Sequence, residues 1–499
     1  MKNLIYTATI LFLITFLTSC NESFLETTPT DTYTEVIFWN TEADALSAIN
    51  GCYNSFYRFD DEWRFENATP NAFNEAGEIN LATGHHDAGN ERFFKDVWAA
   101  NYEGIGRTNS VLAKIDQIEM DENLKQRIKG EALFLRAFCY ANLLNYYGGV
   151  PLILDPPKIE QSDFPRNGKD EVIQQIVSDF DSASDLLPSG NSYSGSDVGR
   201  ASKGAALGMK ARVLLYESRW GEAAEAAKKV MDLGDYSLFP DYRGFYLPEN
   251  QNNDEVIFDR QYMIPESDHS MDRQVEHQLN MNPIQNLIDD YLMIDGMSIE
   301  DSPLYDPDNP YDNRDPRLIN TIAVPGKMFR GEILDAEVFR AKYWSTGYTF
   351  KKLTQYKDDV IENDIYPSDL NFIILRYADI LLMYAEAQNE VSGPDVSVYD
   401  AMHKIRFRAG MPDVTSGLTK EEMREVIRHE RRIELAGEAL YYNDIRRWRT
   451  AEVVNNGNFY DIDGDVVQSR TFNPARDYLW PIHIDIIQEN PALEQNPGY

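Results

Sequence analysis

Apolar residues recur at intervals of three and four over long stretches of the chain, which is the spacing of one face of an α-helix. Gly148-Gly149-Val150-Pro151 and Ser392-Gly393-Pro394 interrupt this pattern in the way that helix ends do. The pattern predicts a mostly helical chain. The predicted helices lie at 43–57, from about 97, and at 124–147, 171–187, 202–218, 221–233, 372–390, 396–409 and 419–448.

Two of these helices, 202–218 and 221–233, are joined by the short turn Arg219-Trp220. Both carry alanine at helical spacing, and small side chains let two helices approach closely. Such a pair resembles a tetratricopeptide repeat, a helical hairpin of about 34 residues. We therefore expect a scaffold of tetratricopeptide-like hairpins over about 41–59, 97–234 and 372–450.

Helical periodicity is absent from two stretches rich in Asp, Asn, Pro and aromatic residues, 60–96 and 235–371. Loops this long are usually functional or disordered, and the aromatic content argues against disorder. Short strands are expected at Glu255–Arg260 and Ile319–Val324. The expected organisation is a single domain over 41–499, with the scaffold, an irregular lobe over 60–96 and 235–371 that contains short strands, and a C-terminal segment over 451–499.

The N-terminus predicts the compartment. Lys2 precedes a largely apolar stretch over 4–17, which is shorter than the roughly 20 residues of a membrane-spanning helix. Leu17-Thr18-Ser19-Cys20 follows, and small residues before a cysteine are typical of a lipoprotein signal peptide. We expect a signal peptide over 1–19, lipidation of Cys20 and a tether over 20–40. An ordinary secretory signal is the alternative.

The amino-acid composition argues against two classes of protein. The 499 residues include 47 Lys+Arg against 82 Asp+Glu, a net charge of −35, which argues against a nucleic-acid partner. With only three cysteines, a disulfide scaffold is excluded. Cys52 and Cys139 lie in helical patterns and are expected to be buried thiols, although the sequence leaves a disulfide between them open.

Charged residues interrupt the apolar face of several predicted helices. A buried charge must be paired, so these residues predict a network of ion pairs between helices rather than a catalytic site. The residues are Arg376, Asp379, Glu386, Lys404, Arg406, Glu430, Arg431, Glu434, Glu438, Asp444 and Arg447.

The sequence offers little for catalysis or metal binding. His429-Glu430 begins a zinc-protease pattern, but Ile433 stands where the second histidine would be. Asp306, Asp308 and Asp312 are weak candidates for calcium, and no cofactor is expected. With 82 acidic residues, no spacing singles out the two carboxylates of a glycosidase.

Ligand recognition is the sharper hypothesis, because aromatic rings stack on the apolar faces of sugars while polar side chains bind hydroxyl groups. The irregular stretches supply both types of residue. The candidate platform residues are Trp63, Phe65, Phe73, Tyr305, Tyr311, Trp344 and Tyr348. The candidate polar contacts are Asn67, Asn74, His85, Asn90 and Arg92.

Several segments, in order, resemble the SusD/RagB family of nutrient-binding lipoproteins. They include Gly130-Glu131-Ala132, Tyr147-Gly148-Gly149-Val150-Pro151, Arg314-Asp315-Pro316-Arg317, Leu375-Arg376-Tyr377-Ala378-Asp379, Glu430-Arg431-Arg432-Ile433-Glu434-Leu435 and the terminal Gln495-Asn496-Pro497-Gly498-Tyr499. Two features depart from the family pattern. Asn21-Glu22-Ser23 is a weak version of the acids that often follow the lipidated cysteine, and Pro481-Ile482-His483 replaces the usual Pro-Ile-Pro.

The resemblance implies about four tetratricopeptide-like units that carry an irregular ligand-binding lobe. It also implies a non-catalytic lipoprotein at the surface of the outer membrane. Such a protein captures oligosaccharides and delivers them to a TonB-dependent transporter of the SusC type, for which it acts as a lid. The negative charge favours a neutral glycan over a strongly anionic one. The alternatives are the same lid importing peptides or another nutrient, and a glycoside hydrolase.

Overall fold

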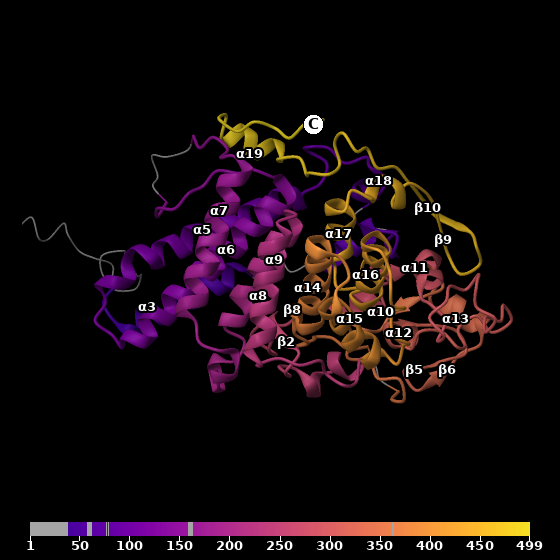
Figure 1. The fold of residues 1–499 in the computed structure, drawn as a ribbon. Coiled ribbons are helices and arrows are strands. Elements are labelled where there is room, and N and C mark those ends of the chain that lie inside the picture. The colour runs from indigo at the N-terminus through magenta and orange to yellow at the C-terminus, as the bar shows by residue number, and fades with distance from the viewer. Residues whose placement is uncertain (1–37, 57–61, 76, 78, 158–162, 362–363) are drawn as a thin grey trace, which may run out of the picture.

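The computed structural model describes residues 38–56, 62–75, 77, 79–157, 163–361 and 364–499 (Figure 1). The expected signal peptide, the lipidation site Cys20 and the tether before residue 38 lie outside these residues. The described chain is mainly helical, as the hydrophobic pattern predicts. Within the described ranges, every helix is too short or too polar to cross a bilayer.

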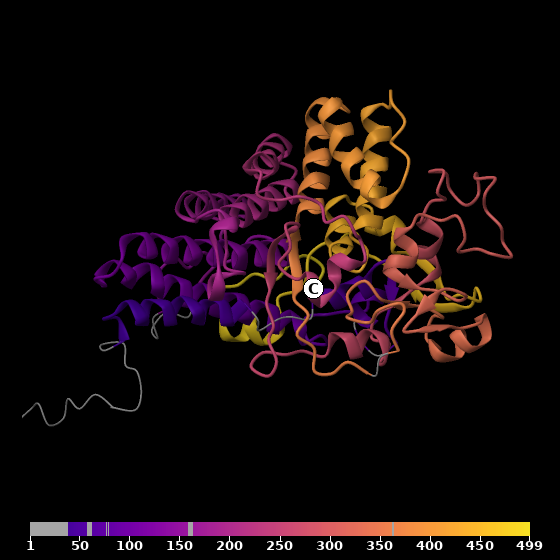
Figure 2. The same cartoon turned by 90° about the horizontal axis from the view of Figure 1, so that it is seen from below.

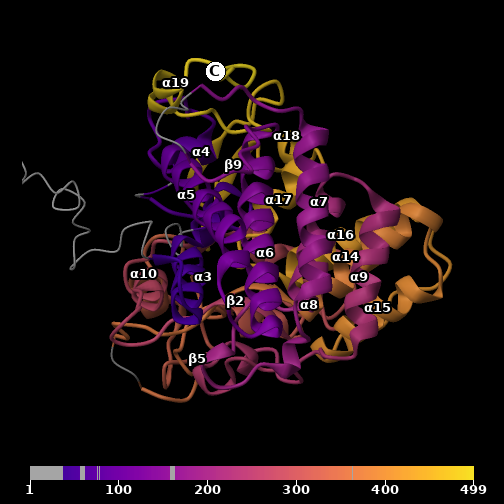
Figure 3. The same ribbon diagram turned by 90° about the vertical axis from the view of Figure 1, so that its left-hand side faces the viewer.

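From α3 (Glu42–Phe56) to α9 (Trp220–Leu233) the scaffold helices pack in chain order and lie side by side (Figure 3). Further along the chain, α15 (Val396–Ala409) and α16 (Lys420–Glu434) both pack against α14 (Tyr377–Ser392). After α9 the chain passes through the irregular lobe, and α14 then packs against α9 and continues the stack. The lobe is thus inserted between α9 and α14. The scaffold helices are α3 (Glu42–Phe56), α5 (Phe93–Lys114), α6 (Glu122–Tyr147), α7 (Lys169–Leu186), α8 (Lys203–Tyr216), α9 (Trp220–Leu233), α14 (Tyr377–Ser392), α15 (Val396–Ala409), α16 (Lys420–Glu434) and α17 (Tyr441–Arg447).

Helix ends follow the capping chemistry of the sequence. The Ser202 side chain accepts a hydrogen bond from Ala205 N at the start of α8, and Thr419 and Glu422 form a reciprocal capping box at the start of α16. Gly234 and Gly410 end α9 and α15 in the left-handed region that glycine adopts without strain.

Three predicted elements were wrong in part. Residues 372–376 form a strand and not the first turn of a helix, because they pair with β2. The predicted helix 419–448 is two helices, since Gly437 and Ala439 adopt positive φ angles between α16 and α17. The predicted strand Ile319–Val324 is split between helix α12 and strand β4.

Among the described residues, the irregular lobe and the C-terminal segment contain short helices and five two-stranded antiparallel sheets. These are β1–β3, β2–β8, β4–β7 and β5–β6, and the sheet β9–β10 of the C-terminal segment. In Figure 2 the lobe lies beside α14–α16, on the opposite side from the indigo N-terminal helices. The strands are β1 (Ala72–Phe73), β2 (Val256–Arg260), β3 (Asn282–Pro283), β4 (Ile322–Ala323), β5 (Met328–Phe329), β6 (Glu332–Ile333), β7 (Thr349–Phe350), β8 (Phe372–Arg376), β9 (Gly457–Tyr460) and β10 (Val466–Arg470). The α-helices outside the scaffold stack are α4 (Ile79–Thr83), α10 (Met271–Glu276), α11 (Gln285–Asp290), α12 (Arg317–Thr321), α13 (Ala336–Lys342), α18 (Ala451–Val454) and α19 (Ile484–Glu489). The short 3-10 helices are η2 (Glu62–Ala68), η3 (Ile115–Gln117), η4 (Gly190–Ser192), η5 (Gly195–Asp197), η6 (Gly244–Tyr246) and η7 (Pro248–Asn250).

Arginines hold the irregular backbone in place by donating to buried carbonyl groups. Arg243 donates to the carbonyls of Lys352, Thr354 and Tyr356. Arg470 donates to the carbonyls of residues 69 and 72, and burial lowers its pKa to about 9. Backbone carbonyls without partners in secondary structure are costly to bury, so these guanidinium groups replace the missing sheet and helix bonds.

The charged residues within apolar helices form buried networks, as predicted. One of them, called here the central ion network, joins residues of the lobe and Arg376 of β8 to α15 and α16. Its ten members are Asp315, Arg317, Lys352, Glu255, Arg376, Arg406, Arg408, Glu430, Glu434 and Glu438. A second group pairs Asp379, Glu386 and Asp444 with Arg212, Arg431 and Arg447. Lys404 is the exception, since its side chain is exposed.

Cys52 and Cys139 are free thiols buried among the N-terminal helices, which confirms the expectation of buried thiols. Burial raises the pKa of each thiol to about 12. Both therefore stay protonated and unreactive at neutral pH.

Candidate functional site

Six of the sequence-predicted ligand residues are buried side chains: Trp63, Phe65, Asn67, Phe73, Asn74 and Tyr348. Helix η2 runs between two cores, so Trp63 packs in the core of the lobe while Phe65 lies 5.1 Å from the Trp480 ring in the core of the scaffold. The Tyr348 hydroxyl donates to Gln285 at 2.7 Å. The structure corrects the expectation that these six side chains face a ligand, because all six are buried.

His85, Asn90 and Arg92 are exposed and lie together in the loop before α5. Asn90 Nδ2 donates to the His85 carbonyl at 2.9 Å, and Arg92 pairs with Asp96 at 3.2 Å. These contacts are local, so the three side chains remain accessible. Their predicted role in ligand binding stays a prediction.

The calcium candidates do not converge. Asp306 accepts hydrogen bonds from Asn309 and from the backbone of Asp308, while Asp312 pairs with Lys327. Across the described ranges, no group of three or more potential ligands is placed to hold a metal ion. Tyr305 lies in the same loop and is half-buried.

Trp344 is the predicted platform residue with an exposed ring, with 57% of its surface accessible. It follows helix α13, and Arg340 of that helix donates to the Trp344 carbonyl. The same guanidinium pairs with Asp461 at 2.8 Å and with Asp463 at 2.7 Å. Arg340 therefore joins the α13 segment to the loop between β9 and β10.

A second exposed ring, Tyr460, ends β9 directly before that loop. Ile462 N donates to the Thr346 carbonyl at 3.0 Å, so the two exposed rings belong to segments that lie side by side. Arg340, Trp344, Tyr460, Asp461 and Asp463 are called the Trp344 surface below. Asp461 is buried, so the groups open to a ligand are the two rings, the Asp463 carboxylate and the partly exposed Arg340 guanidinium. These groups suit a neutral polyhydroxylated ligand, because the rings stack and the charged groups accept or donate hydrogen bonds.

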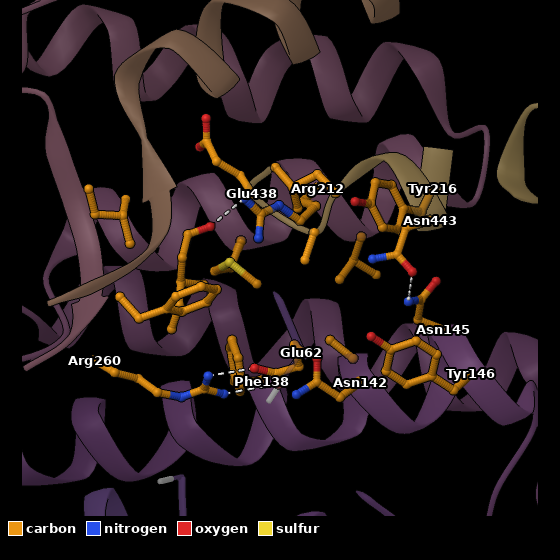
Figure 4. Close-up of a pocket in the computed structure, with 18 residues that line it drawn as sticks. Glu62, Phe138, Asn142, Asn145, Tyr146, Arg212, Tyr216, Arg260, Glu438 and Asn443 are labelled. Carbon is orange, nitrogen blue, oxygen red and sulfur yellow. Dashed lines mark hydrogen bonds and ion pairs between the residues drawn. The ribbon is translucent and has the colours of Figure 1, made fainter. Parts of the chain in front are cut away.

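A partly open cavity of about 90 Å³ lies between α6, α8, β8 and residues 438–443 (Figure 4). Arg260 of β2 and Glu62 of η2 form a two-pronged ion pair at 2.5 and 2.9 Å on its wall. The Tyr216 hydroxyl also lines the cavity and has no hydrogen-bond partner within the described part of the chain. At about 30 Å³ per water molecule, the cavity holds a few waters and is too small for a sugar chain.

The carboxylates of this cavity argue against a glycosidase there. Burial alone would raise the pKa of Glu438, but Arg376 and Lys352 outweigh it and hold the pKa below its ordinary value. A glycosidase acid needs a raised pKa so that it can donate a proton. Glu438 is instead a permanently charged member of the central ion network.

Sequence reasoning selected Trp344 and missed the other members of the Trp344 surface. Tyr460 lies in a short strand whose position beside α13 depends on contacts distant in sequence. The pairing of Glu62 with Arg260 across the cavity is likewise set by the fold and leaves no local pattern.

The described chain is a stack of helices with an inserted irregular lobe that presents an exposed tryptophan. A family model described as "SusD family" matches residues 248–499, and one described as "Starch-binding associating with outer membrane" matches residues 22–215. The chain belongs to the SusD family.

Solved structures share the fold over most of this chain, and curated relatives align with it nearly end to end. A SusD-like protein from Bacteroides fragilis is 28% identical with a TM-score of 0.83, over 95% of this chain and 100% of that one. A SusD-like carbohydrate binding protein from the same organism is 28% identical with a TM-score of 0.84, over 92% of this chain and 100% of that one. A SusD-like protein of Formosa agariphila is 25% identical over 98% of each chain.

Proposed function

We propose that this protein binds a neutral glycan through the Trp344 surface. The observation that carries the proposal is an exposed tryptophan, held by the Arg340 ion pairs, on a member of the SusD family. The name of one family model refers to starch binding, and one structural relative is described as carbohydrate binding. The two carboxylates and single guanidinium of the surface favour a neutral ligand over an anionic one.

The cellular role proposed is capture at the outer membrane. One family model is described as associating with that membrane, and lipidation of Cys20 would tether the protein there. We infer that the protein acts as the lid of a SusC-like TonB-dependent transporter and passes the glycan to it. This role is non-catalytic, and the paired state of Glu438 fits that inference. The import of peptides by the same lid is the competing function.

Isothermal titration calorimetry against a panel of neutral oligosaccharides tests the proposal. Trp344→Ala should weaken binding about tenfold, which corresponds to about 1.4 kcal/mol, because one stacking face is lost. Phe407→Ala is the matched control, since Phe407 is 74% exposed on α15 and lies outside the Trp344 surface. Absence of heat with every glycan would refute glycan binding, whereas equal affinity of Trp344→Ala and wild type would refute the site.

A further inference from the structure

A second hollow opens at the surface where residues 190–202 meet strand β2, and its volume is about 260 Å³. Its wall includes the exposed residues Val198, Asn252 and Asp254, so a ligand can enter from solvent. The inner wall carries Asp259 of β2. This hollow is called the Asp259 pocket. The Asp259 pocket is about three times as large as the cavity of Figure 4. It has room for one sugar-sized unit.

Asp259 is a buried carboxyl group without a cationic partner. Only 4% of the residue is exposed, and its two oxygens accept hydrogen bonds from Gln261 at 3.3 Å and from Asn371 at 3.0 Å. No ion pair to Asp259 occurs among the residues that the structure describes. Burial raises the pKa of Asp259 to about 6, so the group is mostly ionised at neutral pH. An ionised carboxylate held in this way is unfavourable unless something compensates its charge.

The strand geometry explains why Asp259 is unpaired while its neighbour is paired. Successive side chains of a strand point to opposite faces. Arg260 therefore faces the cavity of Figure 4 and Glu62, whereas Asp259 lines the Asp259 pocket and also a smaller hollow that includes its hydrogen-bond partner Asn371. The adjacent guanidinium cannot neutralise the carboxylate from that position.

The rest of the wall increases the negative character of the pocket. Asp235 and Asp254 add two carboxylates, and the one guanidinium, Arg200, is already engaged by Glu131 at 2.9 Å and Asp197 at 2.7 Å. The rings of Tyr193 and Tyr236 also line the hollow. Their hydroxyls are hydrogen-bonded to the Ala201 carbonyl and to Ser202, so these tyrosines offer aromatic surface. Carboxylates beside aromatic rings are the chemistry that recognises an ammonium group.

We propose that the Asp259 pocket binds a protonated primary amine carried by a sugar-sized unit. The inference rests on the proposed glycan binding and extends it from neutral glycans to glycans that carry protonated, unacetylated amino sugars. In the complex, the ammonium group donates hydrogen bonds to the Asp259 carboxylate and supplies the missing counter-charge. An acetylated amine has no charge and gains nothing from this contact.

Calorimetry with three matched trisaccharides tests the inference: β-1,4-linked glucosamine, N-acetylglucosamine and glucose. We expect the glucosamine trimer to bind at least tenfold more tightly than the other two at neutral pH. Asp259→Asn should remove this advantage and leave the affinity for the glucose trimer unchanged. Asp400→Asn, which removes one exposed charge from α15, should change neither affinity.

Two further measurements separate the pocket from global effects. Val198→Trp, which fills the mouth of the pocket and keeps Asp259, should abolish the advantage of the glucosamine trimer as well. Lowering the pH from 7 to 5 should weaken glucosamine binding by up to about tenfold, because protonation removes the charge of Asp259.

The outcomes distinguish this inference from the proposed function. Equal binding of all three trisaccharides, or an unchanged glucosamine affinity in Asp259→Asn, overturns the Asp259 pocket and leaves glycan binding intact. Binding of none of the glycans in the wider panel overturns both. Trilysine is the second source of primary amines, and tight binding of trilysine with none of the glucosamine trimer overturns the sugar assignment and supports peptide import.

Discussion

Removing Arg376 should destabilise the protein more than any exposed charge does. Its guanidinium makes five hydrogen bonds in the central ion network, to the carboxylates of Glu255, Glu434 and Glu438 and to the Glu434 carbonyl. The network holds five cations and five carboxylates, so Arg376→Met leaves one uncompensated negative charge in a site with almost no solvent contact. Removing one partner of a buried pair costs about 3–5 kcal/mol.

The ion pairs that remain after the Arg376→Met substitution should keep the loss of stability near the lower end of that range. Glu434 still contacts Arg408 and Arg317, and Glu438 still contacts Lys352. The double variant Arg376→Met/Glu438→Gln restores the balance of charges, so it should recover about 1–2 kcal/mol of the loss.

Urea unfolding followed by far-UV circular dichroism measures the effect. Lys229→Met is the control, because the Lys229–Glu225 pair on α9 is exposed and is worth less than about 1 kcal/mol. A loss for Arg376→Met no larger than that of the control would refute the reasoning. So would a double variant less stable than Arg376→Met alone.

Four further outcomes follow from burial and charge. Trp63→Ala should lose about 3–5 kcal/mol of stability in thermal unfolding, because Trp63 is only 2% exposed. Trp344→Ala should change stability by less than about 0.5 kcal/mol in the same assay. Asp259→Asn should gain about 1–3 kcal/mol at neutral pH, since burial raises the folded-state pKa of Asp259 to about 6; the gain should vanish below about pH 3, where the wild-type carboxyl is protonated in both states. Wild-type stability should fall as the pH drops below about 4.5, because Arg408 and Arg376 outweigh burial and hold the pKa of Glu434 low, and Arg431 and Arg212 do the same for Asp379.

The helices could be predicted because their apolar positions follow the helical period and their ends carry capping residues. Residues 396–409 coincide with α15, and 221–233 differ from α9 by one residue at the start. Residues 372–376 misled the prediction because a short run of apolar residues has the same appearance in a buried strand and in a helix. Their strand form depends on pairing with β2, which lies far earlier in the chain.

The candidate site was less predictable, because exposure depends on which distant segments lie on either side of a residue. Trp63 and Trp344 both occur in irregular stretches rich in polar residues, yet one is buried in the lobe and the other is exposed. The sequence does single out Asp259, because an acidic residue directly after the apolar run Val256–Phe258 and inside the strand Val256–Arg260 is unusual. Asp259 was nevertheless not among the candidate site residues. The absence of a counter-charge became visible only when both faces of the β2–β8 ribbon were known.

The residues that stabilise this fold differ from those proposed to bind a ligand. The central ion network is buried and costly to alter, and it ties the lobe to the two scaffold helices α15 and α16. The Arg340 pairs of the Trp344 surface are partly exposed, and such pairs contribute about 0–1 kcal/mol. Trp344 and its neighbours can therefore change without loss of the fold. Asp259 differs from both groups of ion pairs in its effect on stability. Its negative charge destabilises the ligand-free protein and becomes favourable only when a cation is bound.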